Sequence, residues 1–313
     1  MAKLRDERHA RILVSVAWES HASAAMKARA WLLLCAAAAF ACGSSSSPSS
    51  PTALAAAAGV QFRVMTFNIQ HGINDAGQYG LDAAVRTIAA VNPDLVGVQE
   101  LTRNHPTYNC EDQPAKIAAD LTAATGRTWS QVYHQEWTTK IFDCKGDGPE
   151  TEGIGFFAPS PISEGKSVQL WNGRLGLLTT LKGGRGLPVI VTHLHAGSTG
   201  SADRLRQLDT LLPWTEQQGA YRLFIGDFNT GPSSTEYQRV TATYRDAWVD
   251  ALAAGTAKGR MDGITHKSSR IDYIFYAPAD ALELVSVETV DTRALVGSET
   301  SDHRPLVATF RVK

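Results

Sequence analysis

The stretch "YRLFIGDFN", residues 221–229, joins an apolar run to a polar end. The run "LFI" predicts a buried strand. Asp227 and Asn229 flank Phe228, and because successive side chains of a strand point to opposite faces, the two polar groups share one face. A core strand that ends in an acid and an amide predicts functional groups at the edge of a sheet.

Other apolar segments of the chain also finish in acids, amides or imidazoles. One polar strand end is ordinary solvation, but several in one chain indicate a common rim where the ends of a sheet converge. The polar residues at these ends are Asn68, Glu100, His193, Asp227, Asn229, Asp272 and the pair Asp302–His303, which precedes the last strand.

Strand-like and helix-like segments alternate along the chain, and strands then dominate. This order predicts a sandwich of two sheets covered on the outside by helices, in the α/β or α+β class. Helices are predicted at 81–91, 114–126 and 201–218. Strands are predicted at 60–70, 94–100, 152–162, 175–195 (as a pair), 221–229, 270–277 and 303–312.

Taken in order, the motifs at these strand ends resemble the endonuclease/exonuclease/phosphatase superfamily, which includes DNase I-like nucleases. The resemblance covers residues 61–312. It implies a four-layer sandwich in which helices flank two mainly antiparallel sheets. It also implies hydrolysis of phosphate esters that depends on Mg²⁺, with Mn²⁺ or Ca²⁺ as alternatives. The matching motifs are Asn68, Gln99-Glu100, Thr192-His193-Leu194, Gly226-Asp227-Phe228-Asn229, Arg270-Ile271-Asp272-Tyr273 and Ser301-Asp302-His303-Arg304-Pro305.

Glu100 is the leading candidate for a metal ligand. Hydrolysis of an anionic phosphodiester needs charge neutralisation and an activated water, and hard divalent cations prefer oxygen ligands. Asn68 and Asp302 would supply further oxygens to the same cation, directly or through water. Without the motif around it, Glu100 would be read as a solvated loop charge.

Two imidazoles belong to the predicted rim, His193 and His303. Either could move a proton or, as a cation, bind a phosphate oxygen near neutral pH. An imidazole needs an orienting carboxylate, and the resemblance assigns Asp272 to His303 and Glu152 to His193. The alternative for Glu152 is a surface charge at the start of a strand.

The resemblance gives Asp227 the role of orienting the attacking water or protonating the leaving group. It gives Asn229 the role of an amide donor to the phosphate. Arg304 is open between a structural ion pair and a phosphate contact. The predicted substrate contacts are Arg103, Arg174, Tyr133 and Arg304, with Arg204, His134, Trp137, His71 and His195 as further candidates near the rim.

The N-terminal segment differs in composition from the rest of the chain. After Met26, which could be the true start, basic residues precede an apolar stretch and then Cys42 and a Ser/Pro run, the order of a secretion signal. We expect a signal at 1–42, a flexible linker at 43–60 and the catalytic domain at 61–313. The sequence around Cys42 resembles a bacterial lipoprotein box, so Cys42 is a candidate for lipidation, and an ordinary cleaved signal peptide is the alternative. Both kinds of signal predict export, as a membrane-anchored lipoprotein or as a secreted or periplasmic protein.

After the predicted signal only two cysteines remain, Cys110 and Cys144. Two cysteines in an exported domain favour a disulfide, with two buried free thiols as the alternative. Their wide spacing, with no adjacent His/Cys pair, argues against a metal site.

The formal net charge of −1 excludes a strong basic bias towards nucleic acid or an anionic surface. Local basic residues can still contact phosphates, and export favours a DNase I-like nuclease acting on nucleic acid. A sphingomyelinase-like or other small-molecule phosphodiesterase is the alternative, favoured by the candidate lipid anchor. A non-catalytic binding module on the same fold is a further hypothesis, against which the intact set of motifs argues. We expect a monomer with no obligate protein partner.

Overall fold

The described residues belong to one folded unit. The predicted signal with Cys42, and the linker up to residue 58, lie outside the described residues. Within the described part of the chain, no helix is both long and apolar enough to cross a membrane. The structure is a computed structural model, and it describes residues 59–138, 144, 148–181, 186–277 and 280–313.

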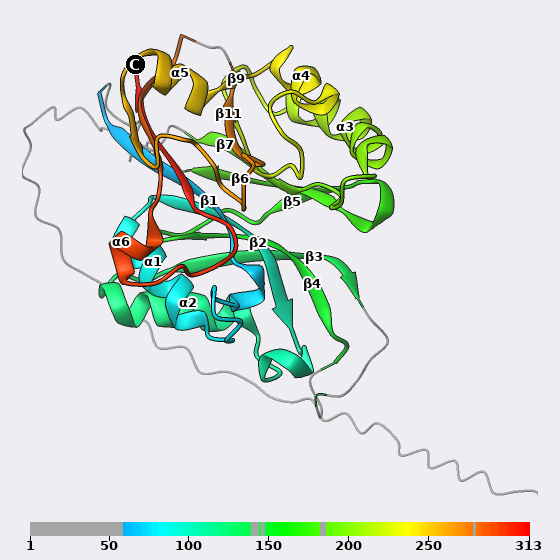
Figure 1. The fold of residues 1–313 in the computed structure, drawn as a ribbon, viewed down its shortest axis with the longest axis vertical. Helices are drawn as coiled ribbons and strands as arrows, with labels where there is room; N and C mark the ends of the chain where they lie inside the picture. Colours follow the sequence, from blue (N-terminus) through cyan, green and yellow to red (C-terminus); the bar gives the residue numbers. More distant parts are fainter. Residues whose placement is uncertain (1–58, 139–143, 145–147, 182–185, 278–279) are drawn as a thin grey trace, which may run out of the picture. The chain divides into compact units, whose positions relative to one another are not determined.

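Two β-sheets form the centre of the folded unit (Figure 1). The first contains, in spatial order, β10 (Ala257–Gly259), β12 (Leu282–Thr289), β13 (Leu306–Val312), β1 (Gln61–Asn68), β2 (Leu95–Arg103), β4 (Thr151–Ala158) and β3 (Ser130–Thr138). The second contains β5 (Lys166–Gln169), β6 (Leu175–Leu181), β7 (Leu187–His193), β8 (Leu223–Asp227), β11 (Asp272–Tyr276) and β9 (Arg245–Asp246). Both sheets are mixed: β1–β2, β10–β12 and β7–β8 are parallel, and the other described pairs are antiparallel.

Helices cover the outer faces of the two sheets (Figure 1). The α-helices of the described residues are α1 (Leu81–Val91), α2 (Gln113–Thr125), α3 (Ser201–Glu216), α4 (Thr235–Thr241), α5 (Ala247–Ala253) and α6 (Thr292–Val296). Short 3₁₀ helices are η1 (Gln70–Gly72), η2 (Pro106–Tyr108) and η3 (Trp171–Gly173). Helices α1 and α2 lie beside the seven-stranded sheet, and α3 and α4 beside the six-stranded sheet.

Three apolar clusters hold the four layers together. In β1, Val64 belongs to the cluster between the two sheets, whereas its neighbour Met65 packs with Ile88 of α1. In the six-stranded sheet, Phe224 of β8 turns outward to a third cluster with Leu208 of α3. This alternation follows from the two-residue period of a strand. The predicted four-layer sandwich is confirmed.

The parallel strand pairs bring polar strand ends together. Asn68 lies opposite Gln99 in the β1–β2 register, and His193 lies opposite Asp227 in the β7–β8 register. The antiparallel partner β11 starts at the same edge, with Asp272 opposite Asp227. The predicted rim therefore exists as one end of the sandwich.

Two bulges flank strand β4. In β2 the register shifts between Val98 and Leu101, and Glu100 in this bulge has a left-handed φ of 58°. In β3 the register shifts between Gln135 and Trp137, so that Glu136 is the extra residue. A bulge re-aims a side chain and is common next to active sites. Both bulged residues are glutamates at the polar end of the sheet.

Gly153 of β4 lies directly opposite the bulge in β3. A Cβ at this position would lie 2.1 Å from the carbonyl oxygen of His134, closer than any side chain tolerates. The approach of the two strands at the bulge therefore requires glycine at this position.

The helices predicted at 81–91, 114–126 and 201–218 match α1, α2 and α3 to within two residues. Strands β3, β5, β9, β10 and β12 and helices α4, α5 and α6 were not predicted. Strands β5, β9 and β10 have only two to four residues. Strands β3 and β12 are partly exposed along most of their length and lack the clean alternation of a half-buried strand. The last predicted strand begins at Leu306, so the Asp302–His303 pair lies in the segment before it.

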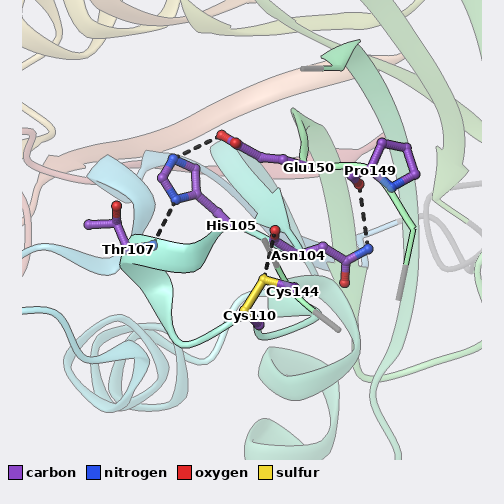
Figure 2. Close-up of a disulfide and its surroundings, with 7 residues drawn as sticks. All are labelled: Asn104, His105, Thr107, Cys110, Cys144, Pro149 and Glu150. Carbon is purple, nitrogen blue, oxygen red and sulfur yellow. Dashed lines mark hydrogen bonds and ion pairs between the residues drawn. A yellow bond between two sulfur atoms is a disulfide. The ribbon is translucent and has the colours of Figure 1, made fainter. Parts of the chain in front are cut away.

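The predicted pairing of Cys110 with Cys144 is present, with a Cα–Cα distance of 5.6 Å (Figure 2). Close to it, His105 Nε2 lies 2.9 Å from Glu150 Oε1. The disulfide therefore ties the segment after β2 to the segment that leads into β4, which carries Glu152.

Candidate active site

Asp227, at the end of β8, lies at the centre of the polar strand ends. Its Oδ2 lies 3.2 Å from Nδ2 of Asn68, 3.5 Å from Nε2 of His193 and 3.8 Å from Nε2 of His303. Burial raises the pKa of Asp227 to about 7, and the neighbouring charge of Asp272 adds to this effect. Three nitrogens from three other strands or loops thus surround one buried carboxylate oxygen.

His303 is held by Asp272. Its Nδ1 lies 2.8 Å from Oδ2 of Asp272, and its backbone N–H donates to Ser301 Oγ at 3.1 Å. Burial alone would lower the pKa of His303, but the carboxylates of Asp272 and Asp227 outweigh it and raise the pKa to about 10. The structure therefore brings together the predicted pair, with His303 as an imidazolium.

His193 has a different environment from the one predicted. Its Nδ1 lies 2.8 Å from Nη1 of Arg174 and 4.0 Å from Oε2 of Glu136. Burial and the charge of Arg174 lower the pKa of His193 well below its usual range. Glu152, the predicted partner of His193, has a carboxylate oxygen within 4.8 Å of an imidazole nitrogen, but Arg174 makes the hydrogen bond to Nδ1.

Glu136 is a buried acid that the sequence did not single out. Burial raises its pKa to about 7, against the opposing charge of Arg174, and burial together with the charge of Glu100 raises the pKa of Glu152 to about 8. Glu136, Glu152 and His193 lie close enough to one another to be considered as a metal site. The guanidinium of Arg174 already supplies a positive charge beside these acids, and its Nη1 donates a hydrogen bond to Nδ1 of His193. We therefore read this cluster as a buried ion pair.

Glu100 faces the rim from the bulge in β2. Its Oε1 accepts from Asn68 Nδ2 at 2.9 Å, and its Oε2 lies 3.3 Å from His71 Nε2. The side-chain oxygen of Asn68 accepts from the backbone N–H of Gln70 at 3.0 Å. In this arrangement the side-chain amide of Asn68 orients the carboxylates of Glu100 and Asp227, and its role as a metal ligand stays a prediction.

Asp302 forms a second partly exposed acid of the rim. Its Oδ2 lies 3.3 Å from Nε2 of His266, whose ring stacks on His303 with centroids 4.4 Å apart. Burial opposes ionisation of Asp302, but the hydrogen bond from His266 and the charge of His303 lower its pKa. The sequence did not single out His266, which follows no strand end and precedes the "RIDY" motif in a loop.

The acids of the rim fit a hard divalent cation. The side chains of Glu100 and Asp302 are 21% and 32% exposed, whereas Asp227 and Asp272 are buried. The charges of both exposed acids act on His71, where they oppose the lowering of its pKa by burial. Two open carboxylates beside water suit Mg²⁺ or Mn²⁺, which keep several water ligands. The predicted ligand set of Glu100, Asn68 and Asp302 stays a prediction, in which the two carboxylates would hold the ion.

Asn229 has a left-handed backbone, with φ at 51°. Its backbone N–H donates to Asp227 Oδ1 at 2.8 Å, and its side-chain Nδ2 donates to the carbonyl oxygen of Leu194 at 3.0 Å. One amide hydrogen of Asn229 is thereby engaged, and donation of the other to a phosphate stays a prediction.

The predicted substrate contacts are engaged with other parts of the protein. Arg103 stacks over Tyr133, with Cζ 4.4 Å from the ring centroid, and its Nε lies 3.1 Å from Oδ1 of Asp112. Nη1 of Arg304 donates to the carbonyl oxygen of Ile264 at 3.3 Å. Arg174 is buried. These contacts give the arginines structural partners, and substrate binding by Arg103, Tyr133 and Arg304 stays a prediction.

An exposed aromatic side chain lies in η3, in the segment that leads to Arg174. Trp171 is 46% exposed, and the guanidinium of Arg206 lies 3.5 Å from the centroid of its ring. The side chain of the next residue, Asn172, is hydrogen-bonded to Nδ1 of His195 at 3.1 Å. Because His195 follows His193 by two residues, this contact places Trp171 near the end of β7. The sequence indicated His195 but not the Trp171–Arg206 pair.

The model of the Endonuclease/Exonuclease/phosphatase family matches residues 65–303. No curated protein shows significant similarity to the chain. An endonuclease/exonuclease/phosphatase from Beutenbergia cavernae is 22% identical, with a TM-score of 0.62 over 80% of this chain and 72% of that one.

Two eukaryotic structures share the fold at lower identity. The human Nocturnin catalytic domain with bound sulfate is 20% identical, with a TM-score of 0.58 over 81% of this chain and 95% of that one. D. rerio TDP2 complexed with single-strand DNA product is 18% identical, with a TM-score of 0.57 over 80% of this chain and 99% of that one.

Proposed function

The chain belongs to the endonuclease/exonuclease/phosphatase family, whose members hydrolyse phosphate esters, and we propose that it is a metal-dependent phosphodiesterase that cleaves nucleic acid. The observation that carries this proposal is the environment of Asp227. Its buried Oδ2 faces Asn68, His193 and His303, beside two acids that are open to water.

Each part of this arrangement has a use in phosphodiester hydrolysis. A divalent cation held by Glu100 and Asp302 would neutralise negative charge on the phosphate. Asp227, with its pKa raised to about 7, suits transfer of a proton from the attacking water or to the leaving oxygen. The imidazolium of His303 offers a positively charged donor to a phosphate oxygen.

The Trp171–Arg206 pair supports nucleic acid as the substrate. An exposed indole beside a guanidinium offers a stacking surface that every nucleobase can use. The structural similarity to TDP2 with single-strand DNA product agrees with a nucleic acid substrate.

We also propose that the protein acts after export. The signal-like segment at 1–42 and the disulfide between Cys110 and Cys144 support this, because disulfides persist in oxidising compartments. Labelling with a fatty-acid analogue tests lipidation of Cys42: label in the wild type but not in Cys42→Ser supports the anchor, and label in neither contradicts it.

The test of the proposed function is an activity panel with Mg²⁺, Mn²⁺ or Ca²⁺ over plasmid DNA, RNA, sphingomyelin and bis-nitrophenyl phosphate. We expect metal-dependent cleavage of nucleic acid, and a loss of about 10²–10³-fold in Glu100→Ala, because charge stabilisation by a metal contributes several kcal/mol. Lys116→Ala, on the exposed face of α2, is the matched control. Cleavage of sphingomyelin but not of DNA or RNA would contradict the nuclease proposal, and full activity of Glu100→Ala would contradict the site.

A further inference from the structure

Arg174 directly precedes β6 and is only 7% exposed. Its Cζ lies 4.4 Å from the centroid of the Trp137 ring, so the guanidinium is covered on one face. Nη1 donates to Glu136 Oε2 at 2.8 Å and lies 2.8 Å from Nδ1 of His193. This single nitrogen therefore joins a glutamate of the seven-stranded sheet to a histidine of the six-stranded sheet.

The chemistry of arginine fixes the direction of the second contact. A guanidinium has N–H donors only and does not lose its proton in proteins, so it cannot accept from an imidazole. Nδ1 of His193 must therefore be the acceptor. A neutral imidazole carries one proton, and that proton must then be on Nε2.

We propose that Arg174 is a positioning residue that fixes His193 as a neutral imidazole with its proton on Nε2. Nε2 lies 3.5 Å from Oδ2 of Asp227, so the N–H is directed at the centre of the proposed active site. The lowered pKa of His193, caused by burial and by the charge of Arg174, agrees with a neutral ring. His193 then donates a hydrogen bond, and proton transfer falls to Asp227 or another group.

Glu136 affects the proton position of His193 in two ways. It holds Arg174 in place through the buried ion pair, and it is also the nearest alternative partner for His193, at 4.0 Å from Nδ1. Without Arg174, an Nδ1–H of His193 could donate to Glu136, and Nε2 would lose its hydrogen. Arg174 therefore decides which nitrogen of His193 carries the proton.

Nuclear magnetic resonance of the metal-free protein with ¹⁵N-labelled histidine tests the proposal. Long-range ¹⁵N–¹H correlations near neutral pH distinguish a protonated from an unprotonated ring nitrogen, and His193→Gln identifies the signals of His193. We expect an unprotonated Nδ1 and a protonated Nε2. A proton on Nδ1, or on both nitrogens, in the wild-type protein would overturn the proposal, and this measurement needs no Arg174 variant to fold.

A pair of variants tests whether Arg174 is the cause. In Arg174→Met we expect the proton on Nδ1, and a loss in kcat on the order of 10²-fold with a smaller change in KM, because the Nε2 donor is lost. Arg174→Lys keeps a cationic donor, so we expect the Nε2–H form and partial recovery of kcat. An unchanged Nε2–H form in a folded Arg174→Met protein contradicts the causal role.

The catalytic meaning of this inference rests on the proposed function, but the proton position does not. If His193 carries its proton on Nε2 and no phosphodiester is cleaved, the proposed function fails and the inference stands. If nucleic acid is cleaved and His193 carries its proton on Nδ1, only the inference fails.

Discussion

His193 and His303 are two buried imidazoles that face the same oxygen of Asp227 and differ in what holds their other nitrogen. The partner of His303 is a carboxylate, Asp272, and the pKa of His303 is raised to about 10. The partner of His193 is Arg174, and burial and Arg174 lower the pKa of His193. The partner on Nδ1, and not the residue type or its place on the rim, sets the charge of each ring.

The two partners reach the rim by different routes. Asp272 starts β11 of the six-stranded sheet, whereas His303 precedes β13 of the seven-stranded sheet, so the support of His303 crosses between the sheets. Arg174 precedes β6 and His193 ends β7, and these two strands pair within the six-stranded sheet. Only Glu136, which holds Arg174, comes from the other sheet, in β3. The cationic and the neutral imidazole therefore depend on different parts of the fold.

Asp227→Asn should have the largest effect, because it removes the carboxylate that both imidazoles face. We expect a loss in kcat on the order of 10²–10⁴-fold, since a group that transfers a proton contributes by that amount. Nuclease assays check this, with circular dichroism to confirm the fold. Asp209→Asn, an exposed acid of α3, is the control. Near wild-type activity in Asp227→Asn would remove Asp227 from the centre of the site.

Asp272→Asn should remove the largest of the carboxylate charges that raise the pKa of His303 and cost about 10–100-fold in activity, as loss of an orienting partner does. The raised pKa of His303 stabilises the metal-free folded protein fully below the unfolded pKa of about 6.5, and this contribution is lost as pH rises towards about 10. Urea unfolding of the metal-free protein over this range should show a decline in stability that Asp272→Asn reduces. An identical decline in both proteins would contradict the assigned partner.

His266→Ala should act on the His303 half of the site alone. His266 stacks on His303 and contacts Asp302, so we expect a loss of about 10-fold in activity and weaker metal binding. The proton of His193 should stay on Nε2, as measured by the same ¹⁵N correlations. Ser268→Ala, an exposed neighbour in the same loop, is the control. A change at His193 would show that the two halves are coupled.

Cys110→Ser with Cys144→Ser should have the smallest effect on activity. Removal of this disulfide is expected to cost about 2–4 kcal/mol of stability. Below the unfolding transition, both imidazoles should keep their environments, because neither contacts the disulfide segment shown in Figure 2 directly among the described contacts. Denaturant unfolding and nuclease assays of the double variant check both statements. A large loss of kcat in the folded variant would mean that this segment also positions Glu152.

The sequence predicted the parts of the site that depend on local pattern. Alternation places Asp227 and Asn229 on one face of a strand end, and the motif order pointed to Asp272 beside His303. These contacts require only that neighbouring strand ends meet. The sandwich was predicted from the order of strand-like and helix-like segments and from the family resemblance. In the structure, one face of each central strand packs on the other sheet and the opposite face on helices.

The sequence did not predict the parts that depend on register between strands. Glu136 turns inward because a bulge in β3 adds one residue against β4, and nothing in "SQVYHQEWT" marks that position. The contact between Arg174 and His193 depends on the register between β6 and β7, in which Gly176 lies opposite Thr192. For this reason Glu152 was predicted as the partner of His193, whereas in the structure Arg174 makes the hydrogen bond to its Nδ1. His266 reaches Asp302 from a loop, where no periodicity exists to guide a prediction.

The position of β13 affects how the protein folds. This strand is the last along the chain, yet it lies between β12 and β1 in the middle of a sheet. Beside it, Ser301 Oγ donates to the backbone oxygen of Asn68 at 2.8 Å, across 233 positions of sequence. Neither the seven-stranded sheet nor the rim can therefore form until segments more than 200 residues apart in sequence have met. Closing so long a loop costs entropy before the contacts repay it, so we expect the rim to be completed late in folding.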